Sequence, residues 1–194
     1  MADKQTADER PAVPLPSDDA LMEKIRTRDQ AAFSQLLKRH LPAVHRYLTR
    51  MTGNAADSDE LSQETFLRVW ETAGRYQPGR VRFTTWLHRI AHNLYVDAAR
   101  KRRAGPLPED LEVEDPDPGP EQRVQMLQQQ RDLQRALMAL PATQRSALLL
   151  CQVQGFSNPE AAVILRTGTR AVESLLARAR RNLREQLYPS EQTT

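Results

Sequence analysis

The chain has 194 residues, with 28 Lys and Arg against 25 Asp and Glu, so its formal net charge is only +3. Hydrophobic residues make up 39% and charged residues 27%, which excludes a wholly disordered chain. No apolar run approaches the roughly 20 residues of a membrane-spanning helix, the acidic start is unlike a secretory signal, and the single cysteine excludes an internal disulfide. We therefore expect a cytoplasmic protein that buries one medium core or two small ones.

Proline and charge divide the chain into segments. Residues 1–18 are polar, acidic and proline-containing, which predicts a disordered tail. Residues 104–120 hold five prolines and six acidic residues with no basic one, and this composition predicts a flexible linker. An ordinary surface loop is the less favoured alternative, because structureless loops of this length are uncommon within a domain. The linker would separate two domains, residues 19–103 and 121–187, and residues 188–194 would form a C-terminal tail.

The first domain begins with a long amphipathic helix. Apolar residues recur at spacings of three and four from Phe33 to Met51, which is typical of one buried helical stripe. Pro42 lies inside this stripe and is expected to kink the helix. Gly53 is expected to end it.

The next helix is capped by Asp57 or Ser58 and runs to about Ala73. Its sequence alternates acidic and apolar residues at helical spacing, which suits docking onto another protein, since an acidic face would repel DNA. An ordinary helix with a solvated acidic face fits the same pattern. The candidates for a protein contact are Asp59, Glu60, Gln63, Glu64, Phe66 and Trp70.

A loop at residues 74–82 and a helix at residues 83–103 combine aromatic and basic side chains. Aromatic faces beside arginines suit stacking on unpaired bases, although the apolar stripe favours a core position for Phe83 and Trp86. Tyr76 and Asn93 are expected to be free at the surface. Four cations end the helix, more than are needed to complement its dipole. The candidates for nucleic-acid contact are Arg75, Tyr76, Arg80, Arg82, Trp86, Asn93, Arg100, Lys101, Arg102 and Arg103.

The second domain also reads as helical. We expect helices at residues 124–140, 141–154, 159–165 and 169–187. Ser157 followed by Glu160 predicts a capping box, and Pro141 is expected to be the first residue of its helix. A short capped helix, a turn with Gly168 and a longer basic helix predict a helix-turn-helix over residues 157–180.

The last helix carries a local excess of arginine. Its apolar stripe leaves most of these arginines on other faces, where they would displace the cations condensed on DNA and make binding salt-dependent. A solvated arginine-rich helix is the alternative, which the preceding capped helix and turn disfavour. The residues placed to contact DNA are Thr169, Arg170, Ala171, Glu173, Ser174, Arg178 and Arg181.

The sequence offers little to an enzyme. His88 and His92 have the spacing of a helical metal pair but lack the glutamate of a zinc peptidase motif and a third ligand. Cys151 lies in an apolar helix and reads as a small core residue. With no glycine-rich phosphate loop and no period-two alternation, we expect an all-α protein that is no enzyme and uses no metal, cofactor or small-molecule substrate.

Three blocks of sequence together resemble the extracytoplasmic-function (ECF, group 4) sigma factors of the sigma-70 family. They are Asp59–Trp70; Phe83–Asn93 followed by Asp97 and the basic run; and Leu140–Arg145 continued by Val172–Arg180. The resemblance spans about residues 21–187. It implies that residues 19–103 form the sigma-2 domain and that residues 121–187 form the sigma-4 domain.

The resemblance also implies partners. The Asp59–Trp70 helix, with Arg68, would dock on the β′ clamp helices of core RNA polymerase, and the sigma-4 domain would grip the β flap. The residue 74–103 region, now including Asp97, would read and help melt the −10 promoter element, and the last helix would enter the −35 major groove. Members of the family are usually held by an anti-sigma factor, which is often membrane-bound.

Two other classes remain open at this point: a free-standing helix-turn-helix regulator, and an interaction adaptor built from helical bundles. The Asp59–Trp70 helix argues against the first, because a regulator acting alone has no need of it. The charge distribution favours DNA binding by both domains, since residues 21–103 carry a net +8 and residues 121–187 a net +5. The other segments of the chain are acidic, so the net charge of the whole chain is only +3.

Overall fold

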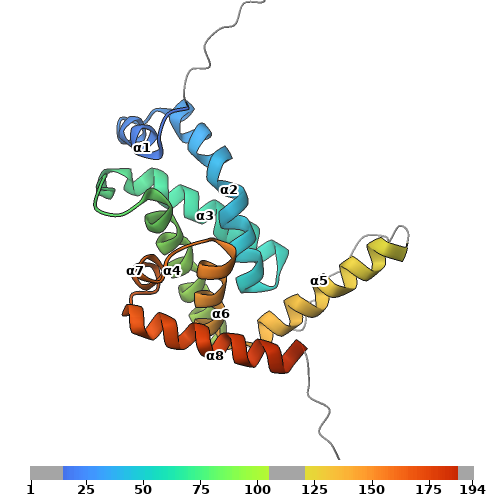
Figure 1. Ribbon diagram of the computed structural model, residues 1–194. Coiled ribbons are helices and arrows are strands. Elements are labelled where there is room, and N and C mark those ends of the chain that lie inside the picture. The colour runs from blue at the N-terminus through green and yellow to red at the C-terminus, as the bar shows by residue number, and fades with distance from the viewer. Residues whose placement is uncertain (1–14, 105–120, 188–194) are drawn as a thin grey trace, which may run out of the picture.

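The computed structural model describes residues 15–104 and 121–187, which are helical and contain no strand (Figure 1). This confirms the predicted all-α class. The helices are α1 (Asp18–Arg26), α2 (Gln30–Thr52), α3 (Ala55–Thr72), α4 (Phe83–Ala104), α5 (Glu121–Ala139), α6 (Ala142–Leu148), α7 (Asn158–Leu165) and α8 (Thr169–Leu187), with a 3-10 turn η1 (Ala73–Arg75) and a π-helical segment η2 (Leu149–Val153). The expected tails and linker lie mainly outside the described residues.

Local side-chain caps fix where the helices of the first half begin. Ser17, Asp29 and Asn54 each accept a hydrogen bond from a backbone N–H in the first turn of α1, α2 and α3. The prediction that Asp57 or Ser58 caps α3 is therefore wrong, because Asn54 supplies the cap one turn earlier. Gly53 ends α2 as predicted, with a left-handed φ of 70°.

The second half contains the expected helix-turn-helix. Ser157 and Glu160 form the predicted capping box at the start of α7. The carbonyl of Gly168 accepts hydrogen bonds from the first turn of α8. Pro141 is the residue before α6 rather than its first helical residue, and α6 continues into a π-helical turn that the sequence pattern does not predict.

The two halves pack against each other through one continuous core (Figure 1). The ring of Phe156, just before α7, lies edge-on to His88 of α4, with the ring centroids 4.8 Å apart. Gln154 donates to the carbonyl of Ala43 in α2, and Ser146 of α6 lies 3.6 Å from the sulfur of Met51. Figure 1 shows α7 beside α4, α8 along the base and α5 projecting from the body.

Arg145 is the most buried cation at this junction, with 5% of its surface exposed. One guanidinium nitrogen donates to the carbonyl of Met138 at 3.1 Å, near the C-terminus of α5, where cations complement the helix dipole. The other donates to the hydroxyl of Tyr95 in α4 at 3.0 Å. Arg145 thus ties α5 and α6 to the first half.

Candidate functional site

An open apolar groove lies between α2 and α3. Its volume is about 640 Å³, and we call it the α2–α3 groove. It is lined by Gln30, Phe33, Ser34, Leu37, Leu41, Ser62, Gln63, Phe66, Leu67 and Trp70. Leu41 and Leu67 are 37% and 49% exposed, and Trp70 packs edge-on against Phe33 at 5.1 Å. An exposed apolar surface rimmed by polar residues is typical of a protein interaction site.

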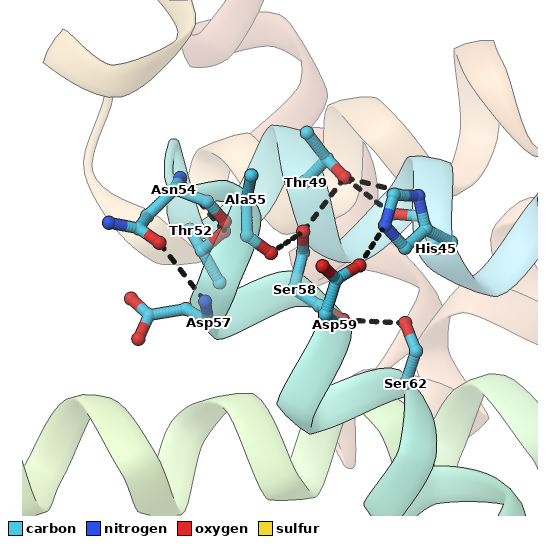
Figure 2. A network of polar contacts seen from close by, with 9 residues as sticks. All are labelled: His45, Thr49, Thr52, Asn54, Ala55, Asp57, Ser58, Asp59 and Ser62. Carbon is cyan, nitrogen blue, oxygen red and sulfur yellow. Dashed lines mark hydrogen bonds and ion pairs between the residues drawn. The ribbon is translucent and has the colours of Figure 1, made fainter. Parts of the chain in front are cut away.

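A network of polar contacts fixes α3 against the end of α2 (Figure 2). Thr49 donates to the hydroxyl of Ser58 at 3.1 Å, and Ser58 in turn donates to the carbonyl of Ala55 at 2.8 Å. Nε2 of His45 lies 2.8 Å from a carboxylate oxygen of Asp59. The network thus joins the C-terminal part of α2 to the N-terminal part of α3.

The residues expected on the α3 docking face are divided between the surface and the core. Asp59, Glu60, Gln63 and Arg68 are exposed, Glu64 and Trp70 are partly exposed, and Phe66 is buried. Arg68 is paired with Glu64 at 2.7 Å, and this hydrogen bond raises the pKa of the guanidinium further. The face is therefore a row of acidic residues beside the α2–α3 groove, with Phe66 forming the groove floor.

Tyr76 differs from its expected free position. Only 3% of it is exposed, its ring packs against Phe83 and Trp86, and its hydroxyl donates to the carboxylate of Asp19. Burial and the Asp19 charge raise the pKa of Tyr76. The expectation of a free Tyr76 is wrong, whereas the core position favoured for Phe83 and Trp86 is confirmed.

The basic residues of the loop and of α4 lie at the surface. Arg75, Arg80, Arg82, Asp97, Arg100, Lys101 and Arg102 are exposed and Asn93 is partly exposed, while the side chain of Arg103 is outside the described part. Arg82 pairs with Glu160 of α7 at 3.2 Å. Burial opposes ionisation of Glu160, but hydrogen bonds from Ser157 and the Arg82 charge together lower its pKa. Arg102 pairs with Asp57, and Arg100 with Asp97 at 3.2 Å.

Helix α8 has the predicted division of faces. Val172, Leu176 and Ala179 are buried against the rest of the half. The candidate DNA contacts Arg170, Ala171, Glu173, Ser174, Arg178 and Arg181 are all exposed, and Thr169 is partly exposed. The arginines are therefore available on the surface of the helix-turn-helix.

A second groove separates α8 from α4. Its volume is about 620 Å³, and we call it the α4–α8 groove. It is lined by His92, Tyr95, Val96, Ala142, Thr143, Ser146, Leu165, Arg166, Thr167, Ala171, Ser174, Leu175 and Arg178. Three of the predicted recognition residues, Ala171, Ser174 and Arg178, thus face α4 of the other half.

The two histidines of α4 are held neutral. Burial lowers the pKa of His88 to about 4 and that of His92 also to about 4, the Arg166 charge adding to the effect at His92. Nδ1 of His88 lies 2.9 Å from the carbonyl of Thr84, and Nδ1 of His92 lies 3.0 Å from the Tyr47 hydroxyl. The two histidines thus have separate partners. No cluster of three or more candidate metal ligands occurs in residues 15–104 or 121–187.

Cys151 is half-buried, and burial raises the pKa of its thiol. This is the opposite of the shift that activates a nucleophilic cysteine. Among the described helices, none is long and apolar enough to cross a membrane.

Sequence reasoning missed two kinds of candidate residue. Leu41 and Leu67 line the α2–α3 groove, yet they have the same periodicity as the buried leucines around them. Arg166, in the turn before α8, has a left-handed φ of 52°. In the sequence, Arg166 stands at the end of a short predicted helix, where glycine is usual, and this unusual residue could have identified the position as a candidate.

Both halves of the chain match known protein families. Residues 36–105 match Sigma-70 region 2, and residues 130–183 match Sigma-70 region 4. The ECF RNA polymerase sigma factor SigE of Mycolicibacterium smegmatis is 40% identical over 168 residues, which cover 83% of this chain and 65% of that protein. The RNA polymerase sigma factor NccH of Alcaligenes xylosoxydans xylosoxydans is 32% identical over 180 residues, covering 90% of this chain and 96% of NccH.

A solved structure shows the same arrangement of helices. It is the sigma factor RpoE in complex with the anti-sigma factor NepR from Bartonella quintana, with a TM-score of 0.67 and 26% identity over 82% of this chain and 98% of that one. The fold defines an all-helical protein of two helical halves, the second of which contains a helix-turn-helix. The chain belongs to the sigma-70 family, as an ECF sigma factor. It is therefore a promoter-recognising factor of RNA polymerase and not a free-standing regulator.

Proposed function

We propose that the α2–α3 groove and the acidic row beside it form the surface that binds core RNA polymerase, at the β′ clamp helices. The supporting observation is the apolar groove itself, with Leu41 and Leu67 exposed on its rim. Interfaces of this kind have an apolar centre and a charged rim that steers the partner. Asp59, Glu60 and Glu64 supply such a rim for a basic partner surface.

We further propose that the loop before α4 and the exposed face of α4 bind the −10 element. Arg75, Arg80 and Lys101 are exposed cations that suit the phosphate backbone, and Asn93 is accessible enough to contact a base. Trp86 and Tyr76 act from the core, where they hold the loop in place. Capturing unpaired bases shifts the duplex equilibrium toward the open form, so strand opening needs no covalent step.

The −35 element is assigned to α8 on the same physical grounds. Its arginines lie opposite its buried stripe, and its N-terminal residues follow the turn of a helix-turn-helix. In such motifs the N-terminal part of the second helix reaches the base edges of the major groove. The domains proposed for these two tasks are residues 19–103 and 121–187, and the second is also the one proposed to grip the β flap.

The α8 surface cannot bind a duplex while the halves are packed together. Ala171, Ser174 and Arg178 line the α4–α8 groove opposite α4, and the groove volume of about 620 Å³ fits a small molecule and not a duplex. Arg82 is also paired across the halves with Glu160. We therefore propose that the contact between α4 and α7–α8 breaks when the promoter is bound.

An anti-sigma factor is proposed as the regulatory partner, acting in the cytoplasm where promoter DNA is found. The support is the RpoE structure from Bartonella quintana, which is a complex with an anti-sigma factor. An inhibitor that covered the α2–α3 groove would compete directly with polymerase.

Transcription in a purified system tests the proposed function. The chain is added to core RNA polymerase and a mixed library of promoter fragments, and the RNA start sites are mapped. We expect discrete start sites that depend on the chain, preceded by common −35 and −10 sequences. Start sites that are unchanged when the chain is left out would contradict the proposal.

A further inference from the structure

Two residues other than glycine have a left-handed backbone in the described part of the chain: Arg28, with φ of 67°, and Arg166, with φ of 52°. In the left-handed conformation the side chain of an L-residue crowds its own backbone carbonyl. Arginine at either position therefore lowers the stability of the fold relative to glycine. Both positions nevertheless carry arginine. A residue kept in a strained conformation needs a compensating contact, either in the fold or with a ligand.

The fold itself accounts for Arg28. Its guanidinium donates to the carbonyl of Trp70 at 3.1 Å, and its central carbon lies 5.2 Å from the centroid of the Trp70 ring. These contacts join the turn between α1 and α2 to the end of α3. Arg28 therefore has a structural reason to be arginine.

Arg166 has no such reason. It ends α7, where its backbone N–H bonds to Ala162, a contact that glycine would make equally well. Its side chain is exposed, and within residues 15–104 and 121–187 its guanidinium makes no hydrogen bond or ion pair. The positive charge of Arg166 lowers the pKa of His92, because it disfavours a second positive charge on that histidine. This interaction therefore does not stabilise arginine at position 166.

The surroundings of Arg166 indicate what it contacts. Two arginines and two hydroxyl residues, Arg166, Arg178, Thr167 and Ser174, all line the side of the α4–α8 groove opposite α4. Guanidinium and hydroxyl groups are the side-chain donors that bind DNA phosphates. Thr167 and Arg166 lie directly before α8, at the end of the helix that a helix-turn-helix presents to the duplex.

We propose that Arg166 contacts a DNA phosphate beside the −35 element, and that this contact is what retains arginine at a position suited to glycine. The proposal rests on the assignment of α8 to the −35 major groove. A phosphate contact adds affinity without reading sequence. Arg166 then sets how tightly the factor holds the −35 element, while the residues on α8 set which sequence it holds.

The test compares Arg166→Gly with Arg28→Gly, two identical changes at the two left-handed positions. In the free chain, Arg166→Gly should raise the urea midpoint of unfolding, whereas Arg28→Gly should lower it because the bonds to Trp70 are removed. Holoenzyme saturated with core polymerase is then titrated with promoter DNA at several salt concentrations. Arg166→Gly should weaken binding about 3- to 10-fold and reduce the salt slope by about one, and Arg28→Gly should leave the slope unchanged.

A third variant separates charge from backbone strain. Arg166→Lys keeps the cation and should restore the salt slope, and every variant should keep the preference of the parent for one −35 sequence over another. An unchanged slope in Arg166→Gly, or a lowered urea midpoint in that variant, would overturn the proposal. If Arg178→Ala weakens promoter binding and Arg166→Gly leaves it unchanged, only the inference about Arg166 fails. If both variants leave promoter binding unchanged, the assignment of α8 to the −35 element fails as well.

Discussion

The α2–α3 groove and the α4–α8 groove have similar volumes, about 640 and 620 Å³, but they are built differently. The first lies within one half, between helices that follow each other in the chain, and it is apolar and open. The second is shared between the halves and combines Arg166 and Arg178 with the partly buried His92. Under the proposed function this difference predicts an order of events, in which a partner enters the first groove at once and DNA reaches the second surface only after the halves separate.

Acid should weaken the packing of α4 at the junction between the two halves. His88 and His92 have pKa values of about 4 in the folded chain, below the ordinary value of 6.5. Between pH 4 and pH 6.5 the unfolded chain therefore binds more protons than the folded chain. Their contribution is complete above about pH 6.5 and is lost as the pH falls toward 4. Going from pH 7 to pH 5 should cost about 4 kcal/mol, or about 2 kcal/mol for each histidine.

Urea unfolding at pH 7, 6 and 5 measures this loss. His88→Phe should remove about half of the pH dependence, since one of the two histidines then no longer titrates. A parent-like pH dependence in His88→Phe would contradict this account of the junction.

A charge placed in the first groove should abolish much of the affinity for polymerase. Leu67 is 49% exposed on the groove rim, so Leu67→Asp leaves the core of the free chain intact. We expect core polymerase to bind about 30- to 100-fold more weakly, which is the size of effect found when a binding hot spot is lost. Leu15→Asp, at a residue that is 83% exposed outside the groove, is the matched control. Equal polymerase affinities for the two variants would exclude the groove as the docking site.

Removing two arginines from α8 should weaken DNA binding without affecting polymerase binding. Arg178→Ala combined with Arg181→Ala should lower promoter affinity about 10- to 30-fold and reduce the salt slope by about one for each phosphate that no longer has an arginine beside it. Lys24→Ala combined with Arg26→Ala, at two exposed cations of α1, controls for the change in net charge. The measurement is promoter binding by the holoenzyme over a range of salt concentrations. A slope equal to that of the control would contradict the assignment of α8.

The ion pair between Arg82 and Glu160 should contribute least. The Arg82 side chain is 72% exposed, so solvent screens the pair, and exposed pairs are worth less than about 1 kcal/mol. Glu160→Gln keeps a side chain able to complete the capping box and removes the charge. Its free energy of unfolding should fall by no more than this amount, and a loss above about 2 kcal/mol would show that the pair holds the halves together by itself.

Sequence reasoning succeeded where structure is determined locally. The capping box of Ser157 and Glu160 and the stop at Gly53 depend on residues within a few positions of each other, and the apolar stripe of α8 repeats over several turns. The same reasoning failed for Tyr76, because its hydroxyl is bound by Asp19, which is 57 residues away in the chain. No local pattern reports such a contact.

The packing of the two halves could not be predicted for the same reason. Arg145 belongs to a family motif, but its bond to Tyr95 joins residues 50 positions apart. Leu41 and Leu67 have helical spacing typical of the core, and only the arrangement of α2 and α3 leaves them exposed. Periodicity therefore predicts which face of a helix is apolar, but not whether that face is covered.

The distance between the halves, with and without promoter DNA, tests the central claim most directly. Spin labels are attached to cysteines replacing Ala56 in α3 and Ala177 in α8, both exposed, in a Cys151→Ala background, after confirming that the labelled chain supports initiation. The account predicts one short, narrow distance distribution in the free chain and a longer distance in the promoter complex with polymerase. A distribution that stays short in the promoter complex would show that the halves remain packed together, and would contradict it.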